Sequence, residues 1–298
     1  MDIELLAFQF CDYCIQFKGY SKDTIRRYKT HIRQYCKYSG AIKTNDITLE
    51  NVRAAFYFGR TERNWRSSSF IAFHASLMVF FKWCMQNGYL KSNPAEEIEV
   101  PRPEKQLPKK LTKEDATKLL EVIHNYPYNN TFLQHRNYAI FSTFIYAGLR
   151  KSELLNLKCT DVDINNLSIF VRQGKGKKDR VIPINYTLAH ALKKYSEERN
   201  KTKKTCPEYF VSLIKNTAFT KTGLKRLSAK IIHSSKIAFT IHQLRHTFAT
   251  LMLEGGCDIY SLSRMMGHSD IKTTTIYLSA SVEHLRAQVA KHPLLRQL

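Results

Sequence analysis

The sequence is short of acidic residues and lacks any long apolar run. Lys and Arg number 47 against 25 Asp and Glu, which gives a formal net charge of +22. No stretch approaches the roughly 18 consecutive apolar residues of a transmembrane helix. The first twenty residues carry Asp2, Glu4 and Asp12, so no signal peptide is predicted. We therefore expect a cytoplasmic protein whose partner is a polyanion, usually nucleic acid.

A disulfide framework is also absent. The seven cysteines are odd in number and scattered, and without a secretory signal they are expected to be reduced thiols. Cys11 and Cys14 form a Cys-x-x-Cys pair, but no second pair supplies the remaining zinc ligands. A spacing of three is also ordinary within a helix. We expect no metal site and no cofactor.

Glycine and proline are too few, at 11 and 8, for a fibrous or disordered chain, and 43% of the 298 residues are hydrophobic. This length suits two domains. The charge is uneven, because residues 1–100 hold 14 basic and 10 acidic residues whereas residues 101–298 hold 33 and 15. The second part is therefore expected to meet the polyanion most extensively.

Residues 1–92 predict a helical bundle. Apolar residues recur at three- and four-residue spacing, which indicates helices over 3–17 and, after the N-cap Ser21, over the following segment. Two further helices are predicted over 49–58 and 67–87. The inward residues of the first two helices are expected to be Ile3, Leu6, Phe10, Cys14, Phe17, Ile25, Tyr28, Ile32 and Tyr35.

A second domain is predicted over 111–298, after a linker over 93–110 that contains four prolines. Helices are expected from Thr112 and over 136–147. Two β-branched runs, 167–172 and 180–184, predict an antiparallel hairpin with a basic tip. Helical patterns return after Thr187 and are expected to continue to the end of the chain. The predicted fold class is mainly α, with a small antiparallel sheet in the second domain.

Several basic and proton-exchanging residues are placed to meet a phosphate. His242 and Arg245 are three residues apart, hence on one face of a helix. Arg150 follows Gly148 at a helix start, and Lys175 lies in the hairpin tip. His268 is expected beside the N-terminus of a helix capped by Ser269 or Asp270, with Tyr277 two turns along it. This set contains cations but no carboxylate, which suits a phosphodiester without a divalent ion.

The order of these residues resembles the catalytic signature of the tyrosine recombinases, and within them the Xer group of bacterial and archaeal recombinases. The resemblance covers nearly the whole chain and includes the local context of each residue. The matching segments are Asn93-Pro94-Ala95, 147–157, 174–180, 242–250 and 266–270 followed by Tyr277.

The resemblance implies a SAM-like core-binding domain, a catalytic domain and a role for each residue. Tyr277 would attack the scissile phosphorus and form a 3′-phosphotyrosyl bond. Arg150 and Arg245 would hold the non-bridging oxygens, and Lys175 would protonate the leaving 5′-oxygen. His242 would assist proton transfer, and His268 would bond the phosphate or the tyrosine. We expect His246 to be structural and Glu153 to support the fold or orient an arginine.

The expected partner is double-stranded DNA with inverted half-sites, bound by a homotetramer that exchanges strands through a Holliday junction. A related second recombinase subunit stays open, and the tail over 282–289 is expected to dock on a neighbouring protomer. Two alternatives are a monomeric type IB topoisomerase and a catalytically silent DNA-binding protein. Candidate DNA-binding residues are Lys22, Arg26, Arg27, Arg66 and Lys177.

Overall fold

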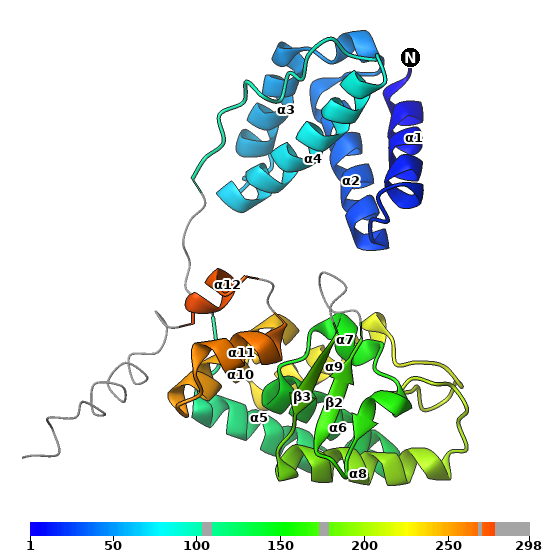
Figure 1. The fold of residues 1–298 in the computed structure, drawn as a ribbon, viewed down its shortest axis with the longest axis vertical. Coiled ribbons are helices and arrows are strands. Elements are labelled where there is room, and N and C mark those ends of the chain that lie inside the picture. The colour runs from blue at the N-terminus through cyan, green and yellow to red at the C-terminus, as the bar shows by residue number, and fades with distance from the viewer. Residues whose placement is uncertain (103–108, 173–178, 268–269, 278–298) are drawn as a thin grey trace, which may run out of the picture. The chain divides into compact units, whose positions relative to one another are not determined.

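The computed structural model describes residues 1–102, 109–172, 179–267 and 270–277 of the chain. The chain divides into two compact units, Met1–Gln106 and Leu107–Leu298. Both are mainly helical, and the three strands found among the described residues lie in the second unit (Figure 1). This confirms the predicted fold class.

The first unit is a four-helix bundle around an aromatic core. Ring contacts such as Phe10 with Phe80 and Tyr35 with Phe81 join its helices. Asn93 and Ala95, from the start of the predicted linker, are buried here, and His74 Nε2 lies 2.8 Å from the Ala95 carbonyl oxygen. The elements are α1 (Ile3–Gln16), α2 (Lys22–Ser39), the 3₁₀ turn η1 (Thr44–Asp46), α3 (Leu49–Thr61) and α4 (Ser67–Gln86).

The predicted inward residues of this unit are confirmed with one exception. Phe17 is 78% exposed, because α1 ends at Gln16 and Phe17 lies beyond its last turn, stacked on Tyr13. Cys11 and Cys14 are buried, and burial raises the pKa of the Cys14 thiol to about 11. Both thiols therefore remain protonated at neutral pH, which opposes a metal-binding role.

Helix α4 is long and apolar enough, by length and composition alone, to cross a membrane. Its side chains account for this composition in another way. Phe73, Leu77, Phe80 and Phe81 are almost fully buried inside the bundle, as in the core helix of a globular domain.

The second unit is built around α6 (Thr131–Ala147), most of whose side chains are buried. Helices α5, α8 and α10 pack against it. The chain enters the unit along α10, since the Leu111 amide donates to Thr247 Oγ1 at 2.9 Å. The other helices are α5 (Lys113–Asn125), α7 (Lys151–Leu155), α8 (Tyr186–Lys201), α9 (Lys221–Ser235), α10 (Ile241–Glu254), α11 (Ile259–Met266) and α12 (Lys272–Thr275), with the 3₁₀ turn η2 (Cys159–Asp161).

The predicted hairpin is present and gains a third strand. Strand β2 (Ser168–Val171) pairs antiparallel with β3 (Arg180–Pro183), with Ile169 opposite Ile182, and its other edge pairs with the two-residue β1 (Val162–Asp163). Two residues are too few for the alternation that signals a strand. The expectation that helices follow Thr187 without a break is wrong, because residues 203–220 form turns and short bridges between α8 and α9.

Gly148 sets the distance between α6 and α10. It ends α6 with a φ of +60°, and a Cβ built on it would come within 2.2 Å of the Phe248 ring. Only glycine combines the left-handed conformation with such a close approach. The same contact brings the Gly148 carbonyl beside the Arg245 side chain.

We predict that Gly148→Ala destabilises the second unit more than Gly256→Ala does. Both glycines have positive φ, so each substitution costs roughly 1–2 kcal/mol of backbone strain, but nothing lies within 4 Å of a Cβ at Gly256. The ring clash at Gly148 adds about 1–3 kcal/mol. Urea unfolding of both variants measures the difference, and equal losses would contradict the packing argument.

Candidate active site

Arg150 is fixed by the short helix that follows it. It is the N-cap of α7, and its amide donates to Glu153 Oε2 at 2.8 Å. Its guanidinium donates to Glu153 Oε1 at 2.6 Å and to the Gly267 carbonyl at 2.9 Å. The side chain is 20% exposed, so it is anchored on one side and open to a ligand on the other.

Arg245 comes from the middle of α10 and is only 2% exposed. Its Nη1 donates to the Gly148 carbonyl and its Nη2 to the Met266 carbonyl, each at 2.5 Å. Burial holds the pKa of Arg245 down at about 10, with Arg150 also lowering it, so the group is still charged at neutral pH. The site therefore places a desolvated cation beside a second one.

The C-terminal end of α11 is held by three arginines. Its last carbonyls have no partner within the helix and each accepts from a different guanidinium. The Met265 carbonyl accepts from Arg180 Nε at 2.8 Å. The next two carbonyls, of Met266 and Gly267, accept from Arg245 and Arg150 respectively. Cations at a helix C-terminus also interact favourably with its dipole. Met266 and Gly267, which precede His268, are thus hydrogen-bonded to the two candidate catalytic arginines, Arg245 and Arg150.

Glu153 is the common counter-ion of this cluster. Arg180 donates to both of its carboxylate oxygens, at 3.0 and 2.8 Å, and Arg245 Nη1 lies 3.9 Å from Oε2. Burial alone would raise the pKa of Glu153, but the bonds and charge of Arg180 and the bonds from Arg150 lower it to about 2. The expectation that Glu153 orients an arginine agrees with these contacts.

Arg150, His242 and Arg245 line one cleft of about 830 Å³. It also contains Lys221 and Lys225 of α9 and several apolar side chains. Burial lowers the pKa of His242, and the charges of Arg245 and Arg150 lower it further, so its imidazole is neutral at pH 7.

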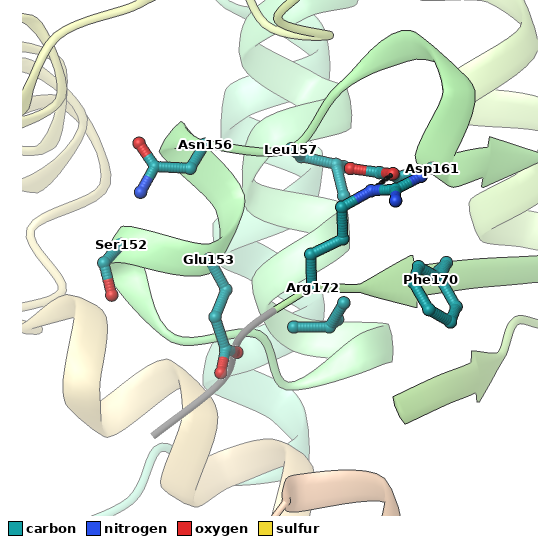
Figure 2. Close-up of a pocket in the computed structure, with 8 residues that line it drawn as sticks. Ser152, Glu153, Asn156, Leu157, Asp161, Phe170 and Arg172 are labelled. Atoms are coloured by element: carbon teal, nitrogen blue, oxygen red, sulfur yellow. Dashed lines mark hydrogen bonds and ion pairs between the residues drawn. The ribbon is translucent and has the colours of Figure 1, made fainter. Parts of the chain in front are cut away.

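A separate pocket of about 70 Å³ on α7 contains Glu153 but no predicted catalytic residue, and in it Asp161 and Arg172 face one another (Figure 2).

Tyr277 is buried against α10 and α11. It is 2% exposed, its ring packs with Phe248 and Met266, and its hydroxyl lies 2.7 Å from His246 Nδ1. Burial raises the pKa of the phenol, while the charges of Arg245 and Arg150 oppose that rise. The phenol is thus neutral at rest and lies within the field of both arginines.

The structure brings together four of the six predicted catalytic residues, Arg150, His242, Arg245 and Tyr277. Lys175 and His268 lie outside the described residues, as do Lys177 and Ser269. The expected helix before Tyr277 is shorter than predicted. Helix α12 has one turn, its N-cap is Ile271 rather than Ser269 or Asp270, and Tyr277 lies just beyond it.

Two neighbours of the catalytic candidates were not assigned a role in catalysis from the sequence. His246 was expected to be structural, yet it contacts the Tyr277 hydroxyl. Arg180 ends the matching segment 174–180, but nothing in its spacing indicates that it bonds Glu153 and the end of α11. Two signals for His246 were available: it lies in the matching segment 242–250, and its spacing of four from His242 places both on one helix face.

Two family models match the chain. Residues 109–284 match the phage integrase family, and residues 8–88 match the phage integrase N-terminal SAM-like domain. The chain belongs to the phage integrase family. Its activity is site-specific DNA recombination, in which the enzyme cuts and rejoins DNA strands. The resemblance to tyrosine recombinases is thereby confirmed.

Similar proteins carry Xer names. The chain is 35% identical over 288 residues to tyrosine recombinase XerA of Thermococcus onnurineus, covering 95% of this chain and 94% of that protein. It is 33% identical over 277 residues to tyrosine recombinase XerD of Listeria monocytogenes, covering 90% and 91%. A crystal structure of XerH site-specific recombinase bound to a palindromic difH substrate shares the fold, with a TM-score of 0.73, 20% identity and coverage of 96% and 84%.

We predict that Glu153→Gln destabilises the second unit by about 3–5 kcal/mol at pH 7, because it leaves buried arginines without their counter-ion. The pKa of Glu153 is lower in the folded protein, so its stabilising contribution is present above its ordinary pKa and is lost as the pH falls toward about 2. Urea unfolding at pH 7 and pH 3 should show a smaller difference between wild type and variant at pH 3. The exposed Glu121→Gln is the matched control, and an equal loss in that variant would contradict this reading.

Proposed function

We propose that the catalytic residues of this recombinase are Arg150, Lys175, His242, Arg245, His268 and Tyr277. The observation that carries the proposal is the convergence of Arg150, His242 and Arg245 on one cleft, with the phenol of Tyr277 in the field of both arginines. Lys175 and His268 lie outside the described residues and enter through their matching sequence context. The proposed domain limits are 1–92, 93–110 and 111–298.

The cleft supports phosphoryl transfer by charge stabilisation. Arg150 and Arg245 would hold the two non-bridging oxygens of the scissile phosphate and neutralise the charge that develops during attack. Removing one such preorganised donor typically costs ~3–4 kcal/mol of barrier. Glu153 pairs with Arg150 and lies close to Arg245, so both guanidiniums need little reorganisation when DNA binds.

Tyr277 would attack the phosphorus and displace the 5′-oxygen, which Lys175 would protonate. His242, which lines the cleft, would assist proton transfer at the phosphate, and His268 would bond the phosphate or the tyrosine. The new phosphotyrosyl bond replaces the phosphodiester that was broken. Rejoining by the free 5′-hydroxyl therefore needs neither ATP nor a metal ion.

The assembly that fits this reaction is a homotetramer on two duplexes with inverted half-sites. Paired exchanges through a Holliday junction need four such active sites, and a related recombinase could supply two of them. The tail over 282–289, outside the described residues, is proposed to dock on a neighbouring protomer. We propose that the protein acts in the cytoplasm.

We predict that wild type forms a covalent DNA complex that Tyr277→Phe cannot form. The substrate is a duplex selected for binding from a random-sequence pool, with nicks scanned along one strand so that the short cleaved fragment diffuses away. The complex is detected as an SDS-resistant band. Tyr260→Phe, an exposed tyrosine of the same unit, is the control and should behave as wild type.

A plasmid carrying two copies of the selected duplex distinguishes the alternatives. Recombined products are expected only with two sites. Relaxation without recombined products would indicate a topoisomerase, and binding without any covalent complex would indicate a catalytically silent protein. Either result would overturn the proposal.

DNA contacts of the first unit are proposed for Lys22, Arg26, Arg27 and Arg66, with Lys177 added from the second unit. The first four are exposed and lie at or near the N-terminal ends of α2 and α4. Arg26 pairs with Asp23 at 2.9 Å, but their side chains are 77% and 61% exposed. Such a surface pair contributes little and exchanges readily for a phosphate or a base.

We predict that Arg26→Ala weakens binding to the selected duplex by about 1–3 kcal/mol and relaxes preference at one base pair. Lys37→Ala, at the other end of α2, is the control and should leave both unchanged. Titrations against duplexes with single substitutions measure the effect. A loss that is uniform over all sequences, with a salt slope smaller by about 1, would assign Arg26 to a phosphate instead.

A further inference from the structure

The nucleophile candidate has a direct partner outside the proposed catalytic set. His246 Nδ1 lies 2.7 Å from Tyr277 Oη, and the two ring centroids are 5.5 Å apart. This contact reaches the phenolic oxygen itself. It joins α10 to the segment after α12.

His246 follows Arg245 directly and lies one turn beyond His242 on α10. The rings of His242 and His246 meet edge to face, with centroids 4.4 Å apart. The groups that face His246 are therefore the neutral imidazole of His242, the cation of Arg245 and the hydroxyl of Tyr277. Among the described residues, no carboxylate contributes to the shift of its pKa.

This environment keeps His246 neutral. Burial is the main cause that lowers its pKa, and together with the nearby His242 and Arg245 it brings the pKa of His246 to about 4. A neutral imidazole has one nitrogen that donates and one that accepts. A neutral phenol donates readily, so the short contact is satisfied when Tyr277 donates and the Nδ1 lone pair accepts.

We propose that His246 is a further catalytic residue, which orients the Tyr277 hydroxyl and accepts its proton at Nδ1 during attack on the phosphate. This inference rests on the proposed role of Tyr277 as nucleophile. In the step, the Tyr277 Oη–H bond breaks and the proton moves to Nδ1, while Oη bonds to phosphorus. The phosphorus–O5′ bond breaks and the leaving oxygen takes a proton from the general acid. In rejoining, each proton returns to its donor.

The two histidines of α10 then have separate tasks. His242 lines the cleft with the arginines, where it would face a bound phosphate, whereas His246 contacts the phenol. A bound phosphate neutralises the arginine charge that opposes protonation of His246, so the acceptor becomes more basic when the substrate arrives. Without DNA the phenol stays protonated and unreactive.

Two substitutions separate proton acceptance from packing. His246→Phe keeps a ring beside His242 but removes the acceptor, and we expect cleavage of the nicked duplex to slow by about 10²–10⁴-fold. His246→Asn can place an amide oxygen near the Nδ1 position and restore orientation but not proton transfer, so its rate should lie between the two. The exposed His190→Asn is the control and should cleave as wild type. Cleavage by His246→Phe at the wild-type rate or faster overturns the proposal.

The pH profile and chemical rescue give readouts that a packing role would not move. The rate of wild-type cleavage should fall as the pH falls through the pKa of His246, because the imidazole is then protonated and cannot accept a proton. This acid limb of the pH–rate profile should be absent in His246→Asn. Added imidazole should restore cleavage to His246→Ala and should leave the rate of His190→Ala, which cleaves as wild type, unchanged. A wild-type acid limb retained in His246→Asn, or no rescue by imidazole, contradicts proton acceptance.

A measurement without DNA keeps this inference separate from the proposed function. In protein labelled with ¹⁵N-histidine, the neutral His246 ring should carry its proton on Nε2, and its Nδ1 signal should shift in Tyr277→Phe. A ring protonated on Nδ1 overturns the proposal even if Tyr277 forms the covalent complex. Conversely, absence of a covalent complex in an otherwise folded enzyme, with the Nε2–H form observed, contradicts the nucleophile assignment.

Discussion

Three arginines share one buried carboxylate and the C-terminal end of one helix, and the arrangement of the catalytic unit depends on these interactions. Glu153 bonds Arg150 and Arg180 directly and lies near Arg245, and the same three guanidiniums occupy the last carbonyls of α11. Each bond satisfies a group whose burial without a partner would be costly. Together they tie α7, β3, α10 and the end of α11 into one assembly.

This assembly makes the cleft strongly cationic while offsetting the electrostatic repulsion among its guanidinium groups. Bringing several guanidiniums together out of water is unfavourable unless anions and carbonyl dipoles offset the repulsion. Glu153 supplies one negative charge against three guanidiniums, so the offset is incomplete and positive potential remains for a phosphate. Burial is the main cause of the lowered pKa values of Arg245 and His242, and neighbouring arginine charges lower both further.

Helix α10 distributes the chemistry along its length. His242 and Arg245 reach the cleft, His246 reaches Tyr277, and Phe248 contacts Gly148 at the end of α6. A rigid helix holds such groups with little orientational entropy to lose on binding DNA. The close approach permitted by Gly148 fixes the distance between this helix and the segment that begins with Arg150.

The sequence by itself determined the helical bundle, the hairpin and the family, because periodicity, turn residues and ordered motifs are local properties. It also placed Arg150, His242, Arg245 and Tyr277 in one candidate site through their matching context. Only the tertiary structure decided that Arg180 shares Glu153 with Arg150, that α12 has a single turn, and that His246 contacts the phenol. Such contacts join side chains that are far apart in the sequence, as when Arg180 bonds both Glu153 and the carbonyl of Met265. Burial and hydrogen bonding at such meetings are set by packing, which no local pattern encodes.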